Sequence, residues 1–234
     1  HGWKIRFIPH IIAPAELPVH INAFKRQQFR WAKGSIQTAR KLLSKLWRSS
    51  QPMRVKFEGS IHLTNYIVHP LVLINLFLTL PLVSSQSPLL WLTPLFALAA
   101  LGPILMYWVA MKSDGKPIRE RISILALLIV LGMGLSINNS RAVFEALIGK
   151  QSSFLRTPKF DIMGKTKSVR SGEYLLPRDP SVWAEIVLAL YASTLLVYVL
   201  VQGVWSLVVW LLLYASGYIM IAGQNFRHDD YVSR

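Results

Sequence analysis

Cysteine is absent from this sequence of 234 residues, and acidic residues are scarce. Without cysteine the chain can form no disulfide and no thiolate metal site. Asp and Glu together number 11 against 26 Lys and Arg, which leaves few carboxylates for metal binding or acid–base catalysis. His10 and His20 lack neighbouring ligands, and His62 and His69 lie seven residues apart on one predicted helix face. His228-Asp229-Asp230 could chelate a metal weakly, but it is interpreted as a polar tail. We therefore predict no metal site in this chain.

Apolar and charged residues are segregated along the sequence. The chain is 53% hydrophobic and carries a formal charge of +15, a combination that excludes an ordinary soluble domain. The apolar residues form blocks of about twenty, which is the length of a helix that crosses the hydrocarbon core of a bilayer. We predict an all-α integral membrane protein with about four transmembrane helices plus amphipathic interfacial helices.

Basic residues indicate which apolar runs cross the membrane, because cytoplasmic loops concentrate Lys and Arg. If the run at 122–137 crossed, the eight basic residues of 141–178 would lie outside. We therefore predict an interfacial or re-entrant helix over about 118–148, although the continuous apolar stretch from Ile122 to Val130 favours a fifth crossing. The predicted spans are at about 62–83, 89–111, 181–201 and 203–223, within a membrane domain of residues 58–226 that is followed by a cytosolic tail, 227–234.

The first 57 residues are polar and basic. Alternating apolar and basic residues over 3–8 predict a half-buried strand, so residues 1–19 are interpreted as the edge of a preceding soluble α/β domain. Because the chain starts at His1 without a signal peptide, we expect it to be the C-terminal part of a longer protein. Residues 20–57 are predicted to contain a basic interfacial helix over about 22–48, with an apolar stripe formed by Ile36, Ala39, Leu43 and Leu46.

Gln27, Arg30 and Trp31 lie near the start of this predicted helix. A guanidinium can donate two hydrogen bonds to a diphosphate, and a glutamine amide can bridge hydroxyl and phosphate oxygens. An indole offers a broad apolar face to a pyranose ring. The alternative interpretation is an ordinary membrane-surface helix with an interfacial tryptophan.

The pattern Gln-x-x-Arg-Trp resembles the signature of processive family 2 glycosyltransferases, which include cellulose synthases and their relatives. A second stretch, Phe154-Leu155-Arg156-Thr157-Pro158-Lys159, resembles the gating loop of cellulose synthases, with Arg156 where Val is expected. The resemblance implies that Gln27 and Arg30 bind the donor diphosphate and that Trp31 stacks on the acceptor glycan. It also implies that Phe154, Thr157 and Lys159 belong to a gating loop over about 150–178.

The resemblance further implies a function and a set of partners. The chain is expected to be the membrane half of an inverting β-hexosyltransferase that polymerises a UDP- or GDP-hexose and moves the growing glycan through the lipid bilayer. Residues 1–19 would then end a truncated GT-A-like domain. That domain would supply the catalytic carboxylates and the Mg or Mn ion, because no acid of this chain lies in an Asp-x-Asp or Thr-Glu-Asp sequence.

Three further expectations complete this interpretation. No nucleic-acid partner is expected. Both termini are expected in the cytosol, with the protein in a bacterial inner membrane, or in a Golgi or plasma membrane if it is eukaryotic. A single-transfer lipid glycosyltransferase of the ceramide type and a transporter or channel without chemistry are the alternatives.

Overall fold

The computed structural model describes residues 6–8, 10–13, 18, 20–151 and 179–232, and every regular element in these ranges is helical. The strand predicted over 3–8 is not formed over 6–8, and its other residues lie outside the described part. The elements, with η for 3₁₀ turns, are α1 Ile21–Arg48, α2 Met53–Thr64, η1 Asn65–Ile67, α3 Val68–Ser84, η2 Pro88–Leu92, α4 Thr93–Ser113, α5 Ile118–Gly134, α6 Ser136–Leu147, α7 Val182–Val201, η4 Trp205–Leu207 and α8 Val208–Val232.

Local sequence accounts for several helix ends. Pro52 and Pro117 stand immediately before α2 and α5. A proline has no N–H and its ring clashes with the carbonyl four residues earlier, so neither helix can extend further towards the N-terminus. Ser87 caps η2 by accepting a hydrogen bond from the Leu89 N–H. Gly203 has a φ of 71° and so permits the tight reversal between α7 and α8.

Three helical segments in the described residues are long and apolar enough to cross a membrane. The count becomes four if α5 and α6, which are bent by 51° at Leu135, form one broken span. The chain thus has several helices compatible with an integral membrane protein, as predicted. The three segments are Met53–Ser84, Val182–Val201 and Trp205–Phe226.

Two predicted boundaries need comment. The first candidate span begins at Met53 rather than near residue 62, because α2 continues through η1 into α3 as a helical segment of 32 residues. The predicted border at residue 57 therefore falls inside α2. The run expected at 89–111 forms η2 and the 21-residue α4, some of whose side chains lie outside the described residues.

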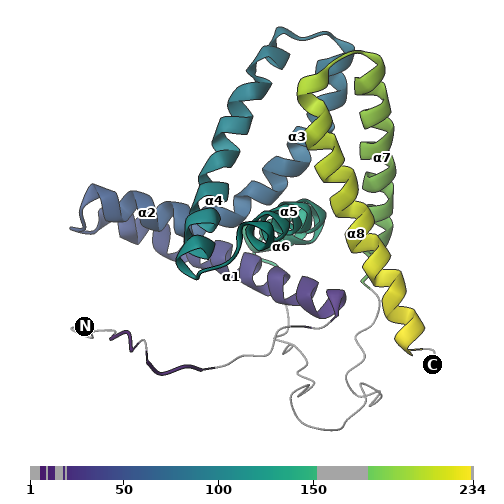
Figure 1. Cartoon of the computed structure of the whole chain (residues 1–234). Coiled ribbons are helices and arrows are strands. Elements are labelled where there is room, and N and C mark those ends of the chain that lie inside the picture. The colour runs from purple at the N-terminus through teal and green to yellow at the C-terminus, as the bar shows by residue number, and fades with distance from the viewer. Residues whose placement is uncertain (1–5, 9, 14–17, 19, 152–178, 233–234) are drawn as a thin grey trace.

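The helices run in different directions (Figure 1). α3, α4, α7 and α8 rise from a common level, whereas α5 and α6 are seen almost end-on and so run across them. This course is compatible with the predicted interfacial or re-entrant helix over 118–148. α1 and α2 lie side by side at the foot of the molecule. The main apolar core joins α3, α7 and α8, through residues that include Leu76, Leu195, Val199, Leu211 and Tyr218.

α5 crosses α8 at two glycines. A Cβ atom built on Gly217 would lie 2.6 Å from the Val130 carbonyl oxygen and 2.7 Å from the Gly134 nitrogen. Gly134 is buried, and a Cβ there would collide with the backbone of Gly217 and the side chain of Ile221. Only glycine permits this backbone-to-backbone approach, which membrane helices commonly use for close packing.

We predict that Gly217→Ala lowers the free energy of unfolding in detergent by about 1–3 kcal/mol, because the new methyl group must push α5 away from α8. Gly132→Ala is the matched control, since a Cβ there meets no atom within 4 Å and alanine favours helix. Denaturant or thermal unfolding of the purified protein measures both variants. Equal stability of the two variants would contradict this packing.

Candidate functional site

α1 has one face against the protein and one face away from it. The predicted helix over 22–48 is confirmed, and of its predicted apolar stripe Ile36 and Ala39 are buried while Leu43 and Leu46 are partly buried. The buried face also contains polar residues that the stripe did not include. Its members are Asn22, Ala23, Lys25, Ala32, Lys33, Ile36 and Ala39.

Gln27, Arg30 and Trp31 share the opposite side of α1. At about 100° per residue, spacings of three and four place them next to one another and away from the buried face. Trp31 is 54% exposed, while Gln27 and Arg30 are partly buried. Gly34 lies on the same side, and a side chain there would meet nothing within 4 Å. The structure thus brings the three predicted residues together on one side of α1, where Trp31 is exposed and Gln27 and Arg30 are partly covered.

The three residues of the predicted gating loop, Phe154, Thr157 and Lys159, lie outside the described residues. The loop's role and its position relative to α1 therefore stay predictions. Asp179 and Ser181, which are described, follow it in the chain and contact α1.

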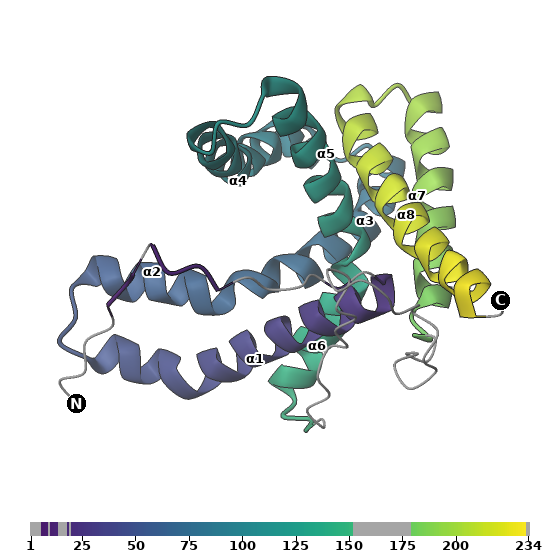
Figure 2. The same cartoon turned by 60° about the horizontal axis from the view of Figure 1, so that its bottom comes forward.

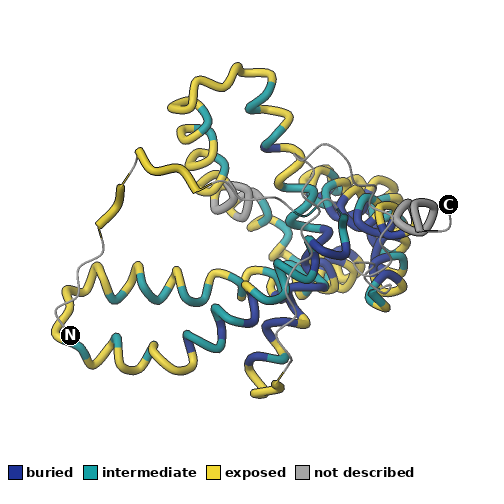
Figure 3. Tube along the Cα trace, turned by 90° about the horizontal axis from the view of Figure 1, so that it is seen from below, coloured by how far each residue is buried: buried dark blue, intermediate teal, exposed yellow. Residues whose placement is uncertain are grey.

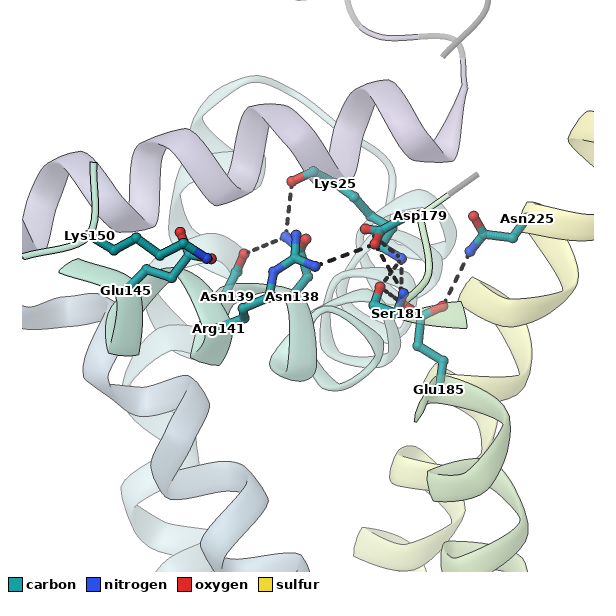
Figure 4. A network of polar contacts seen from close by, with 10 residues as sticks. All are labelled: Lys25, Asn138, Asn139, Arg141, Glu145, Lys150, Asp179, Ser181, Glu185 and Asn225. Atoms are coloured by element: carbon teal, nitrogen blue, oxygen red, sulfur yellow. Dashed lines mark hydrogen bonds and ion pairs between the residues drawn. The ribbon is translucent and has the colours of Figure 1, made fainter. Parts of the chain in front are cut away.

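A buried ion cluster fixes the N-terminal part of α1 (Figure 4). Lys25 and Glu185 both have side chains that are 0% exposed, and Lys25 Nζ donates a hydrogen bond to Glu185 Oε1 at 2.5 Å. Lys25 Nζ also donates to Ser181 Oγ at 2.8 Å and lies 3.3 Å from Asp179 Oδ2. Because a buried charge without a partner is very costly, these contacts determine which face of α1 turns inward.

Hydrogen bonds extend this cluster to α6 and α8. Asn225 of α8 donates to Glu185 Oε2 at 3.2 Å, so both carboxylate oxygens of Glu185 have partners. Asn138 of α6 donates to the Lys25 carbonyl at 2.9 Å. The start of α1 is therefore held by α6 and α7 directly and by α8 through Glu185.

Asp179 lies at the edge of the same cluster, just before α7. Burial by itself raises the pKa of this carboxyl, but Lys25, the Ser181 N–H and Arg141 outweigh it and hold the pKa of Asp179 below its usual range. Arg141 Nη1 lies 3.5 Å from Asp179 Oδ1, and the Arg141 guanidinium carbon lies 4.8 Å from the centre of the Phe29 ring. Asp179 is thus charged at neutral pH and ties α7 to both α1 and α6.

A second set of contacts holds the middle of α1 against α6. Lys33 Nζ donates to Glu145 Oε2 at 2.8 Å, and Arg40 Nη1 donates to the Ala146 carbonyl at 2.6 Å. The Arg40 contact satisfies a carbonyl at the C-terminal end of α6, where a positive charge is favoured. α1 is consequently attached along about half of its length, with its Gln27, Arg30 and Trp31 side left open.

The sequence motifs did not point to Lys25, Asp179 or Glu185. One signal was present: Glu185 is the single charged residue in the predicted span 181–201, and a charge in such a run requires a partner. Its partner, Lys25, lies 160 residues earlier in the chain, so no local pattern pointed to it.

Within the described part of the chain, no three His, Asp or Glu side chains lie close enough together to hold a metal ion. The divalent cation that the family resemblance implies therefore has no fitting ligand set among the described residues.

The fold and this cluster define a helical protein with segments long and apolar enough to cross a membrane. A polar helix, α1, is held at one end of these segments by ion pairs and hydrogen bonds. No protein-family model matches the chain, and no curated protein or solved structure matches it. A more specific function can therefore be proposed only from the side chains of α1.

We predict that Lys25→Met lowers the free energy of unfolding by about 3–5 kcal/mol, because Glu185 is left buried without its cation. The double variant Lys25→Met/Glu185→Leu should lose much less than the sum of the two single variants. Unfolding in detergent, followed by helical circular dichroism, measures the three proteins.

Arg54→Gln is the control, because it breaks an ion pair whose side chains are 87% and 59% exposed. Exposed pairs contribute little, so this variant should unfold like the parent. If the double variant loses as much free energy of unfolding as the two single variants together, Lys25 and Glu185 do not act as a buried pair.

Proposed function

We propose that this chain is the membrane-embedded part of a processive inverting β-glycosyltransferase that polymerises a hexose from a UDP- or GDP-sugar and passes the glycan across the membrane. The observation that carries the proposal is the side of α1 that faces away from its buried contacts, where an amide and a guanidinium lie beside an exposed indole, while the opposite side of α1 is held by α6 and α7. A membrane anchor requires only the indole.

The proposed chemistry assigns one role to each of the three side chains. The acceptor hydroxyl attacks the anomeric carbon of the donor sugar, and the bond from that carbon to the nucleotide diphosphate breaks. Arg30 forks two hydrogen bonds onto the diphosphate, with Gln27 beside it, so the charge of the leaving group is stabilised as it develops. A carboxylate of a preceding catalytic domain receives the hydroxyl proton.

Trp31 holds the acceptor end of the glycan in this proposal. Its exposed ring stacks on the apolar face of a pyranose, and Gly34, about one helical turn further along α1, presents no side chain beside it. Stacking favours any ring of suitable size. It therefore allows the glycan to move by one sugar unit after each transfer. This property suits a polymerase better than an enzyme that adds a single sugar to a lipid.

The lengths of the products separate the proposal from its nearest alternative. A processive enzyme yields long glycan from the nucleotide sugar, while a ceramide-type enzyme yields a lipid with one added sugar. Incubation of the complete protein in its membrane with labelled UDP-hexose or GDP-hexose, followed by size separation of the products, distinguishes them.

We predict that Trp31→Ala abolishes polymer formation by the complete protein, while Trp31→Phe keeps part of it, because stacking requires a ring more than an indole nitrogen. Arg30→Lys should lower the rate by about 100-fold, since an ammonium cannot reproduce the two-pronged contact with a diphosphate. Incorporation of labelled hexose into polymer measures each variant.

Trp47→Ala is the matched control, because Trp47 is a 45% exposed tryptophan of the same helix that donates a hydrogen bond to Ser60 in α2. It should leave polymer synthesis near the parent level. Near-normal polymer synthesis by the Trp31→Ala variant would contradict the stacking role and leave Trp31 as a membrane anchor.

A further inference from the structure

The C-terminal part of α1 carries cations that have no side-chain partner among the described residues. Lys41, Lys45 and Arg48 are all exposed, and their spacing places them along one side of the helix. None of the three makes a hydrogen bond or ion pair with the residues that the structure describes. They contrast with Lys25, Lys33 and Arg40, which all point to partners on neighbouring helices.

Exposed apolar side chains adjoin these cations. α1 and α2 project together from the other helices as an antiparallel hairpin, whose tip is mostly exposed (Figures 2 and 3). Trp47 is 45% exposed, Met53 65% and Phe57 62%, and α2 has no buried residue at all. We call residues 41–57 the hairpin tip, and they contain no acidic residue. A mixture of cations with exposed apolar rings is typical of segments that lie in a membrane interface.

Helix length places this tip beside the lipid headgroups. The segment Met53–Ser84 has 32 residues and would be about 48 Å long if straight, whereas the hydrocarbon core is about 30 Å thick. Roughly 18 Å of it must lie outside the core or along its surface. Arg54, Lys56 and Glu58 are charged and lie at the α2 end, so α2 is the part that stays in the headgroup layer.

We infer that the hairpin tip is a binding site for anionic phospholipid headgroups. Lys41, Lys45 and Arg48 supply the charge, and Trp47, Met53 and Phe57 enter the boundary of the acyl chains. Charge complementarity selects anionic over zwitterionic lipid, because each cation near an anionic surface raises the affinity by about fivefold. The inference depends on charge and exposure and is independent of the proposed transferase activity.

The cysteine-free chain permits a direct test of this site. Met53→Cys, labelled with an environment-sensitive fluorophore in the purified detergent-solubilised protein, is titrated with phosphatidylglycerol and, separately, with phosphatidylcholine. We expect a saturable blue shift with phosphatidylglycerol, much weaker with phosphatidylcholine and reduced by salt. Lys41→Gln/Lys45→Gln in this background should weaken phosphatidylglycerol binding by about 25-fold.

Lys112→Gln/Arg119→Gln is the matched control, because it removes two exposed cations at the junction of α4 and α5 and leaves the tip intact. It should change the affinity by less than about twofold, and both double variants should melt like the parent without lipid. Equal losses from the two double variants would overturn the site in favour of a general charge effect. Equal responses to the two lipids would also overturn it, and would leave an acidic protein surface as the occupant of the tip.

Discussion

The buried pair between Lys25 and Glu185 is the contact on which the lower part of this structure depends. Two charges with no exposure to water must stay together, and they belong to helices 160 residues apart in the chain. Ser181, Asp179 and Asn225 complete their hydrogen bonds, so the cluster ties α1 to α7 and α8. The rotation of α1 about its own axis is thereby fixed.

This fixed rotation gives α1 two different sides. Polar residues that could serve as ligands are divided between an inward side, where Lys25, Lys33 and Arg40 hold other helices, and an outward side with Arg30 and Trp31. A guanidinium on a helix held at several points is pre-organised for a diphosphate and loses little entropy on binding. The same attachment leaves the distal cations of the hairpin tip for the lipid surface.

The sequence predicted those parts of the fold that follow from local patterns. The limits of α1, the helical region at 118–148 and the last two candidate spans came from the periodicity and length of apolar runs. The start at Met53 was missed because α2 is polar and continues a helix whose apolar part begins later. The Gly134–Gly217 crossing and the Lys25–Glu185 pair were missed because each joins residues far apart in the chain. Of the predicted site residues, Gln27, Arg30 and Trp31 do share one side of α1, while their roles stay predictions.

The central claim is that the open side of α1 contacts the glycan during synthesis. A photo-reactive benzophenone amino acid at Gly34, where a side chain meets no other atom within 4 Å, tests it in the complete protein while it works on a labelled nucleotide sugar. The same group at Met53, which is 65% exposed in the hairpin tip, is the reference. The account predicts labelled carbohydrate cross-linked at position 34 and not at position 53. Equal labelling at both positions, or none at position 34 while polymer forms, would contradict it.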